Sequence, residues 1–376
     1  MKHFRVLITG GGTAGHISPL VAVVAQLQTM AASEQIPMEV RYLGAHGPFK
    51  GSLEENNIKV QRVASSKLRS YFAWQNFIDA PKFLYSLFQA LWKIYWYMPG
   101  VLFSKGGPGS LAVVLIARFY RIPVIVHESD AIPGLTTRIS SRFADVIAIS
   151  FTSAAKHFEG KEVIHTGNPV RGYLLTEPLS PEKGKGYFGF NPHQPMLLIL
   201  GGSQGSTSIN DFILDVLVEL LGQVQVFHQT GKADYARVIK EVGVVLGDLP
   251  EEIKSRYKLV DFFEKDIRIA LQGADLVISR AGASGIFEAA AFGKPSILIP
   301  LPWAANGHQQ ANAIEYQQTG ATIVIEQDNL LPHVFLNSIK DLLADPNKLS
   351  TMSDAAKAFY KPDAASNLAR VILRYS

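Results

Sequence analysis

The sequence contains no cysteine among its 376 residues. This excludes a disulfide framework, a thiolate nucleophile and a metal centre with cysteine ligands, and it fits a reducing compartment. No uninterrupted apolar run approaches the roughly 20 residues that a transmembrane helix needs. The first residues also lack the pattern of a signal peptide, because their short apolar run breaks at Gly10-Gly11-Gly12. These absences favour a globular protein without a membrane span.

Charged residues are sparse, at 18% of the chain against 47% apolar, so there is ample material for two domain cores. The net charge of +4 is unevenly distributed. Residues 1–168 carry 17 Lys and Arg against 10 Asp and Glu, whereas residues 169–376 carry 19 against 22. A basic N-terminal half indicates an anionic surface or substrate on that side, although a chance distribution of solvated charges is the alternative.

Metal-binding patterns are missing as well. No group of His, Asp and Glu has the spacing of metal ligands, and there is no Asp-x-Asp pair of the kind that holds a metal under a nucleotide diphosphate. We therefore expect no metal and no other cofactor. Helix N-termini and loop N–H groups would then stabilise leaving-group charge, with Arg171 and Ser203 as the nearest polar helpers.

Short apolar strands alternate with helical segments along the whole chain. A first series of strands is expected at residues 4–9, 39–43, 101–103, 123–127 and 145–149, and a second at 196–200, 225–228, 258–260, 276–279, 296–299 and 322–325. This alternation predicts parallel sheets covered on both faces. Because strand, Gly-rich loop and helix recur at Met196, we predict an α/β protein with two doubly wound domains that face each other.

Proline and glycine clusters place the domain boundary. We expect an N-terminal domain over residues 1–168, a linker over 169–194 and a C-terminal domain over 195–352. The remaining residues, 353–376, are predicted to form a helix that is broken near Lys361-Pro362.

The first Gly loop matches a dinucleotide-binding fingerprint at Gly10-x-Gly12-x-x-Gly15. That fingerprint also requires an acid at the end of the second strand, and the residues there, Tyr42 to His46, supply none, which disfavours NAD. The loop is instead predicted to approach a diphosphate or a sugar. His16 at the helix entrance is the preferred general base, and His127 next to Glu128 comes second.

A second small-residue loop, Ala281 to Gly285, lies between an apolar strand and a helix. Such a helix start exposes backbone N–H groups and the positive end of the helix dipole, which favours an anion. Glu288 one turn later and the amides after the next strand are suited to sugar hydroxyls, so we predict a nucleotide-sugar pocket. The alternatives are that Glu288 only stabilises the helix dipole and that Gln309 is a solvated surface amide.

The stretch from Lys67 to Met98 holds three of the four tryptophans together with Lys67, Arg69, Lys82 and Lys93. Six apolar residues fall at helical spacing and could form a buried face: Phe77, Ala80, Leu84, Leu87, Leu91 and Ile94. The remaining rings exceed what one buried face needs. Two interpretations of this stretch remain: a surface that lies against a membrane, or an ordinary core helix with some aromatic residues on its surface. The first interpretation would indicate a lipid-borne second substrate.

Collinear motifs over essentially the whole chain resemble the MurG family, bacterial transferases that add N-acetylglucosamine to lipid-linked N-acetylmuramoyl-pentapeptide. The motifs are GGTAGHISP from Gly11, FSKGG from Phe103, HESDAIPGLTTR from His127, GNPVR from Gly167, LGGSQGS from Leu200, SRAGASGIFEAAAFGKP from Ser279 and HQQANA from His308.

The resemblance implies a GT-B fold of two Rossmann-like domains separated by a cleft, with the C-terminal helix returning to the N-terminal domain. It implies inverting transfer from UDP-N-acetylglucosamine to the sugar hydroxyl of lipid I, which gives lipid II for peptidoglycan. It also implies a peripheral location on the cytoplasmic face of the inner membrane, an anionic surface, a part in cell shape and division, and no nucleic-acid partner.

Residue roles follow from the same resemblance. His16 would be the catalytic base with Glu128 as alternative or helper, Glu288 would hold the ribose hydroxyls, and the backbone at Phe263 would contact the uracil. Further donor contacts would come from Thr13, Ala14, Gly15, Arg171, Ser203, Ala283, Ser284, Gly285, Ile286, Phe287 and Gln309.

Three positions depart from the family pattern. Ala14 replaces a glycine of the first loop, Asp130 stands where an asparagine commonly contacts the donor sugar, and Pro108 follows the second Gly pair in a loop expected to face the acceptor. We keep Asp130 as a donor-site residue. The alternatives to the transferase are a UDP-N-acetylglucosamine 2-epimerase-like isomerase, which needs no lipid-facing surface, and a non-catalytic GT-B subunit.

Overall fold

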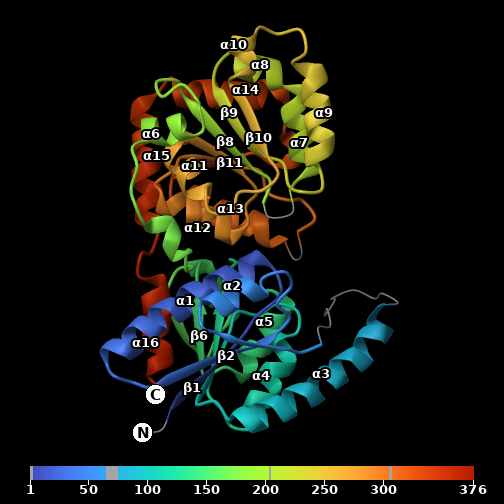
Figure 1. The fold of residues 1–376 in the computed structure, drawn as a ribbon, viewed down its shortest axis with the longest axis vertical. Coiled ribbons are helices and arrows are strands. Elements are labelled where there is room, and N and C mark those ends of the chain that lie inside the picture. Colours follow the sequence, from blue (N-terminus) through green and yellow to red (C-terminus); the bar gives the residue numbers. More distant parts are fainter. Residues whose placement is uncertain (1–2, 65–74, 203–204, 305–306) are drawn as a thin grey trace. The chain divides into compact units, whose positions relative to one another are not determined.

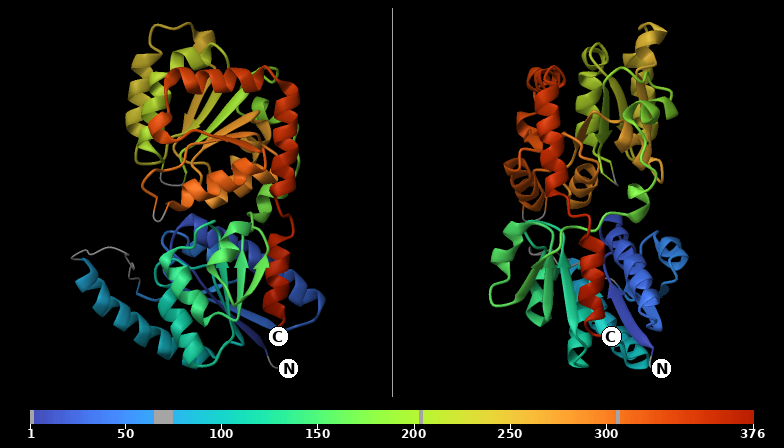
Figure 2. Two further views of the ribbon diagram at one scale, coloured as in Figure 1. Left: turned by 180° about the vertical axis from the view of Figure 1, so that it is seen from behind. Right: turned by 90° about the vertical axis from the view of Figure 1, so that its left-hand side faces the viewer.

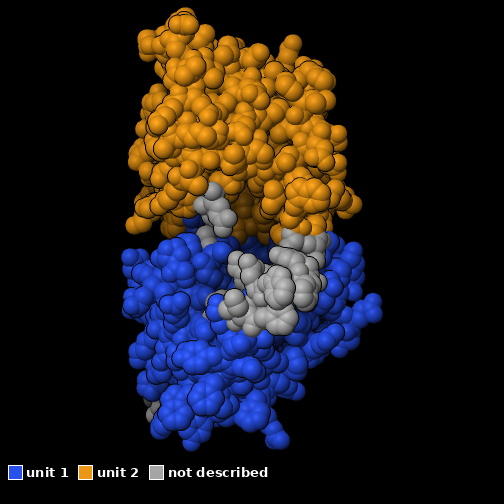
Figure 3. Space-filling view, turned by 90° about the vertical axis from the view of Figure 1, so that its right-hand side faces the viewer, with its two compact units in different colours: residues 1–171, 361–376 blue, residues 172–360 orange. Residues whose placement is uncertain are grey.

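The computed structural model describes residues 3–64, 75–202, 205–304 and 307–376. The chain divides into two compact units, one of residues 1–171 with 361–376 and the other of residues 172–360 (Figure 3). Each unit contains one parallel sheet (Figure 1). Both sheets confirm the predicted α/β architecture.

Unit 1 contains a seven-stranded sheet of order β3-β2-β1-β4-β5-β6-β7. Its strands are β1 (Phe4–Thr9), β2 (Met38–Gly44), β3 (Lys59–Arg62), β4 (Val101–Ser104), β5 (Val124–Glu128), β6 (Val146–Ile149) and β7 (Glu162–His165). The helices are α1 (Ala14–Ser33), α2 (Lys50–Glu55), α3 (Gln75–Tyr97), α4 (Ser110–Phe119), α5 (Leu135–Ser140) and α16 (Ala364–Leu373), with short 3-10 turns η1 (Ser141–Phe143) and η2 (Thr152–His157).

The sheet of unit 1 is buried on both faces because successive side chains of a strand point in opposite directions. Val6 and Ile8 pack with α1 and α16, whereas Leu7 between them packs with α3 and α4. Helix α16 therefore contributes to the unit 1 core although it is the last helix of the chain, and Figure 2 shows it beside the sheet.

Unit 2 contains a six-stranded sheet of order β10-β9-β8-β11-β12-β13. Its strands are β8 (Met196–Leu200), β9 (Gln225–Gln229), β10 (Tyr257–Val260), β11 (Leu276–Ser279), β12 (Ser296–Leu298) and β13 (Thr322–Val324). The helices are α6 (Pro181–Tyr187), α7 (Thr207–Asp215), α8 (Leu217–Leu221), α9 (Tyr235–Val245), α10 (Glu251–Lys254), α11 (Ile267–Gly273), α12 (Ala283–Ala291), α13 (His308–Gln318), α14 (Pro332–Leu343) and α15 (Pro346–Phe359), with 3-10 turns η3 (Gly172–Leu175) and η5 (Gln327–Asn329).

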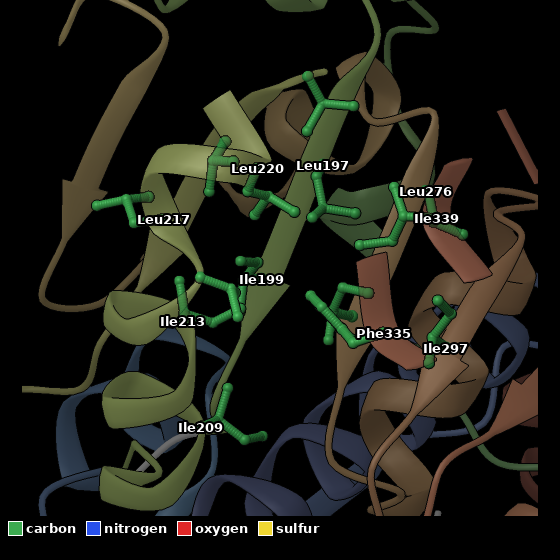
Figure 4. Close-up of a cluster of buried hydrophobic side chains, with 14 of the residues drawn as sticks. Leu197, Ile199, Ile209, Ile213, Leu217, Leu220, Leu276, Ile297, Phe335 and Ile339 are labelled. Atoms are coloured by element: carbon green, nitrogen blue, oxygen red, sulfur yellow. The ribbon is translucent and has the colours of Figure 1, made fainter. Parts of the chain in front are cut away.

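One face of the second sheet packs on α7, α8 and α14. Leu197 and Ile199 of β8 meet Ile213 of α7 and Phe335 of α14 in a continuous apolar cluster (Figure 4). After β8 the sequence predicts one helix from about Ser208 to Leu221, and this is wrong in detail because the segment forms two helices that meet at Val216. The predicted break near Lys361-Pro362 is present, between α15 and α16.

Candidate functional site

The carboxyl ends of β1, β4, β5 and β7 meet at one edge of the first sheet, as they must in a parallel sheet. The loop after β1 leads into α1, whose N-cap is Thr13. Thr13 Oγ1 lies 2.8 Å from His16 Nδ1, so the imidazole is held within the first turn of the helix. A Cβ built on Gly107, in the loop after β4, would lie 2.9 Å from His16 Nε2. Because Gly107 has no side chain, the ring can pack against the backbone of the loop after β4.

Lys105, directly after β4, is a buried cation at this edge, with 3% of its surface exposed. Its Nζ lies 2.7 Å from His127 Nδ1 and donates to Asn168 Oδ1 at 3.2 Å and to the Ser129 hydroxyl. Burial lowers the pKa of Lys105 to about 8, against the opposing effect of the Glu128 and Asp130 carboxylates. Lys105 lies in the FSKGG motif, but the sequence alone indicates no role for it.

Glu128, the last residue of β5, is also buried. One carboxylate oxygen, Oε1, accepts a hydrogen bond from the Asp130 backbone N–H at 3.0 Å. The other, Oε2, has no hydrogen-bond partner in the part of the chain that the structure describes. Burial, and then the negative charge of Asp130, raise the pKa of Glu128 to about 7. A carboxyl group with this pKa can take up or give up a proton near neutrality.

His16 has the opposite perturbation. Burial, and then the positive charge of Lys105, lower its pKa to about 4, whereas Asp130 acts to raise it. The imidazole is therefore neutral at pH 7, which is the form that can accept a proton. Of the predicted residues of unit 1, the structure brings Thr13, His16, Glu128 and Asp130 together at this edge, with the backbone of Ala14 and Gly15 in the first turn of α1.

At the corresponding edge of the second sheet, α12 begins at Ala283 after the N-cap Gly282. The first N–H groups of a helix have no partner within it, so the backbone of Ala283, Ser284 and Gly285 presents donors at the positive end of the dipole. Ile286 and Phe287 are buried and anchor the helix to the core, while Glu288 is half-buried. This edge can accept an anion, as the sequence predicts.

Arg280, in the loop just before α12, is buried and was not predicted as a site residue. Its guanidinium donates to the hydroxyls of Ser206 and Ser208, each at 2.7 Å. It also donates to Gln327 Oε1 at 2.8 Å and to the carbonyl of Ile299 at 3.1 Å. These bonds join the loops that follow β8, β11, β12 and β13. A positive charge with uncharged acceptors adds to the anion-binding character of this edge.

The structure also describes three other predicted donor-site residues, Phe263, Gln309 and Arg171. The N–H of Phe263 donates to Gln229 Oε1 at 3.1 Å, and its ring packs against Phe227. Gln309, in the first turn of α13, accepts a hydrogen bond from the Leu301 N–H at 3.0 Å. Arg171 is half-buried at the end of the first part of unit 1. Ser203 lies outside the described residues.

No group of three or more His, Asp and Glu side chains is placed to hold a metal ion within the ranges that the structure describes. In the same ranges, no helix has the length and apolar character needed to cross a bilayer.

Comparison with known proteins adds independent findings. Residues 6–149 match the glycosyltransferase family 28 N-terminal domain, and residues 196–368 match its C-terminal domain. The chain is 34% identical over 375 residues to a protein of Clostridium kluyveri named UDP-N-acetylglucosamine--N-acetylmuramyl-(pentapeptide) pyrophosphoryl-undecaprenol N-acetylglucosamine transferase, and the match covers 99% of both chains.

Two solved structures show how far the fold is shared. The crystal structure of Acinetobacter baumannii MurG has a TM-score of 0.73 at 26% identity and covers 98% of this chain and 99% of that one. A UDP-GlcNAc 2-epimerase from Neisseria meningitidis, bound to UDP-GlcNAc, has a TM-score of 0.70 at 15% identity and covers 98% and 100%. The epimerase shares the fold, whereas the sequence similarity over the full length lies with the transferases.

Proposed function

This chain belongs to the MurG family of glycosyltransferases, and from that premise we propose that it transfers N-acetylglucosamine from UDP-N-acetylglucosamine to lipid I. Lipid I is the undecaprenyl-pyrophosphoryl-N-acetylmuramoyl-pentapeptide acceptor, and the product is lipid II, an intermediate of peptidoglycan synthesis. The observation that carries this proposal is the identity of 34% to the Clostridium kluyveri transferase over the full length of both chains.

The chemistry proposed is a single displacement with inversion. The acceptor hydroxyl oxygen attacks the anomeric carbon of N-acetylglucosamine, the bond from that carbon to the diphosphate breaks, and UDP leaves with the electron pair. The proton of the hydroxyl passes to His16, which is neutral before the reaction because burial and Lys105 depress its pKa to about 4. Glu128, with a pKa raised to about 7, is the alternative acceptor of this proton.

The donor is assigned to unit 2. The first N–H groups of α12 would stabilise the diphosphate, whose charge grows as the bond to the sugar breaks. Glu288 would accept hydrogen bonds from the ribose hydroxyls, and the backbone at Phe263 would contact the uracil. Phe263 already donates its N–H to Gln229, so its carbonyl is the group left for the base. Gln309 uses its side-chain oxygen to hold Leu301, so its amide N–H groups are available to the sugar.

The remaining donor contacts are proposed on the same grounds of resemblance. Thr13, Ala14, Gly15 and Asp130 lie at the edge of the first sheet with His16, and Arg171 follows β7. Asp130 can accept hydrogen bonds from sugar hydroxyls but, unlike an asparagine, donates none when ionised. We therefore expect its contact to be to a hydroxyl and not to a carbonyl oxygen. Ser203 keeps its assignment as a polar contact of the diphosphate.

A membrane-facing role is proposed for one surface of unit 1. The large side chains of α3 are each more than half exposed at Leu84, Tyr85, Phe88, Trp92, Tyr95 and Trp96. They recur every three to four residues and so form one stripe of the helix. We call this stripe the α3 surface. Leu84, one of the six residues that could have formed a buried face, is exposed, and the buried face of α3 includes Ala90, Ile94 and Tyr97.

The α3 surface continues onto α4. Tyr95 contacts both Trp96 and Tyr120, with ring centroids 5.6 and 6.4 Å apart, and Phe119 beside Tyr120 is largely exposed. A contiguous exposed aromatic patch of this kind is typical of a membrane or protein contact. Lys82 and Arg118 lie on the same two helices and would favour anionic headgroups. Lys67, Arg69 and Trp74, from the same stretch of sequence, lie outside the described residues.

These features support a peripheral protein that docks on an anionic membrane to reach a lipid-borne acceptor. We assign it to the cytoplasmic face of the cell membrane, where a part in cell-wall growth, shape and division would follow from the supply of lipid II.

The decisive experiment incubates the protein with labelled UDP-N-acetylglucosamine and a short-chain lipid I analogue, with EDTA present and no added metal. We expect a labelled disaccharide–lipid product in an amount equal to the UDP released. Release of UDP without this product would refute the lipid I assignment, and a labelled 2-epimer of the donor would identify the isomerase instead. A mock preparation, purified in the same way from host cells that do not express the protein, is the control for contaminating activity.

A further inference from the structure

Lys105 is a buried charged residue at the edge of the first sheet to which the proposed reaction assigns no contact with a substrate. It is 97% buried, and its three acceptors are the uncharged groups of His127, Ser129 and Asn168. A buried ammonium group loses hydration and is retained only where hydrogen bonds and nearby charges compensate it. Its N–H groups are occupied by these acceptors, so Lys105 acts on the site through its neighbours.

The hydrogen bonds of Lys105 join three segments. An ammonium group can only donate, so His127 Nδ1 must accept, and the proton of the neutral imidazole must be on Nε2. That Nε2 lies 3.1 Å from the carbonyl oxygen of Gly167 and can donate to it. Lys105 thereby fixes the tautomer of His127 and connects the end of β5 to the segment after β7. Its bond to Ser129 holds the residue between Glu128 and Asp130.

Lys105 is also close to His16. A Cβ built on Gly10 would lie 3.6 Å from the Lys105 Cβ and 3.7 Å from the His16 Cβ, so both side chains start beside the same glycine. Within residues 3–64, 75–202, 205–304 and 307–376, the charged groups that act on His16 are Lys105 after β4 and Asp130 after β5, with opposite signs. Thr13, Gly11 and Gly107, which also lie beside the ring, carry no charge.

We propose that Lys105 is a positioning residue of the transferase site: it fixes the loop that carries Glu128 and Asp130, and its positive charge offsets the charge of Asp130 at His16, the group that accepts the proton of the acceptor hydroxyl. This inference deepens the proposed function and rests on it. Asp130 acts to favour protonation of His16, and Lys105 opposes it in addition to the larger effect of burial. Lys105 exerts this effect from a buried position.

The first test is the titration of His16 by NMR in protein labelled with 13C-histidine, with the resonance assigned by its loss in His16→Asn. In the wild type we expect a midpoint near 4. In Lys105→Met the midpoint should rise by about 1 pH unit, because a nearby charge is removed while burial remains. Lys105→Arg keeps the charge and should keep the midpoint low. Lys161→Met removes a lysine elsewhere in unit 1 and should leave the midpoint unchanged.

Two results would overturn the inference: an unchanged His16 midpoint in folded Lys105→Met, or equal shifts in Lys105→Met and Lys105→Arg, which would indicate a packing effect. If Lys105→Met does not fold, Lys105→Gln, which removes the charge and keeps a polar side chain, takes its place, and an unchanged His16 midpoint in that variant contradicts the proposal.

The second test uses the transfer reaction. Lys105→Met should lower kcat about tenfold at pH 7.5, since positioning is lost, and the acidic limb of its pH–rate profile should move to higher pH by the same amount as the His16 midpoint. In Lys105→Arg the acidic limb of the pH–rate profile should lie at the same pH as in the wild type. If the wild type makes no disaccharide–lipid product, the proposed function fails while the titration result stands. An active Lys105→Met with an unmoved acidic limb refutes the role of Lys105 alone.

Discussion

The Thr13 hydroxyl and the Nδ1 atom of His16 lie 2.8 Å apart in the first turn of α1. This contact fixes the orientation of an imidazole whose other nitrogen, Nε2, lies beside the backbone of Gly107. The Gly loops after β1 and β4 and the Thr13 hydroxyl thus hold a neutral histidine at the carboxyl end of a parallel sheet. Reactive groups of α/β proteins are commonly found there.

If His16 is the base, His16→Ala should lower kcat by about 10²- to 10⁴-fold, which is the usual contribution of a positioned base. UDP affinity, measured by calorimetry, should stay within about twofold, because the charge of the nucleotide is bound by other groups. Thr13→Val, which removes only the orienting hydroxyl, should have a smaller effect on kcat. A near-normal rate for His16→Ala would transfer the role of base to Glu128.

Glu288→Ala should weaken UDP binding about tenfold or more, because hydrogen bonds to a charged group typically contribute about 1.5–3 kcal/mol. The matched control is Glu241→Ala, which removes an exposed helical carboxylate that is paired with Arg237. Calorimetry with UDP and with uracil alone separates the ribose from the base. Unchanged UDP affinity in Glu288→Ala would remove this residue from the ribose site.

The α3 surface should bind anionic vesicles, and Trp92→Ser with Trp96→Ser should reduce flotation with such vesicles at least about tenfold, because two amphipathic rings are lost from the contact. Trp303→Ser is the matched control, since Trp303 is 91% exposed but lies in unit 2. Binding should weaken with salt as headgroup charge is screened. Equal flotation of the double variant and the wild type would show that α3 does not dock on lipid.

The pH dependence of stability in unit 2 should depend on His228. Its ring lies between Tyr257 Oη at 3.0 Å and Asn210 Oδ1 at 3.1 Å, and burial lowers its pKa to about 3. Below pH 6.5 the unfolded chain therefore binds a proton that the folded state does not. The stability contributed by neutral His228 is complete above pH 6.5 and is lost as the pH falls toward 3.

At pH 5 this loss amounts to about 2 kcal/mol. Between pH 7.5 and pH 5, the free energy of unfolding of unit 2, measured by urea denaturation of the full chain, should therefore fall less in His228→Gln than in the wild type. The difference should be about 2 kcal/mol. His193→Gln, at an exposed position of the same unit, should behave as the wild type does. The same loss in His228→Gln and wild type would contradict the assignment.

Strand positions were predictable because parallel strands buried on both faces form continuous apolar runs, as in β1, β8 and β11. The edge strands β3 and β7 were not predicted. Lys59–Arg62 and Glu162–His165 each have exposed ends around only two half-buried residues and contain charged residues, so no apolar run marks them. Their pairing depends on neighbours that are distant in the sequence. The break at Val216 also has no sequence signal, since neither proline nor glycine occurs there.

The residues of the candidate site also include some that could be predicted from the sequence and some that could not. Gly loops and helix starts have local signals, so His16 and the 283–288 segment could be predicted from sequence. Lys105 and Arg280 could not, because an isolated basic residue is usually solvated on the surface. Only the folded structure shows that each is buried and hydrogen-bonded to several separate segments. A basic residue directly after a buried strand and before a Gly-rich loop was the available signal.

The position of α16 has a consequence for biosynthesis. Leu368 and Ile372 of this helix belong to the apolar core that α1 and β1 begin. During synthesis the ribosome produces these residues only after all of unit 2, residues 172–360, has been made. Unit 1 starts first but cannot complete its core until α16 emerges, whereas unit 2 can fold from a continuous segment. The nascent chain therefore finishes its second unit before its first.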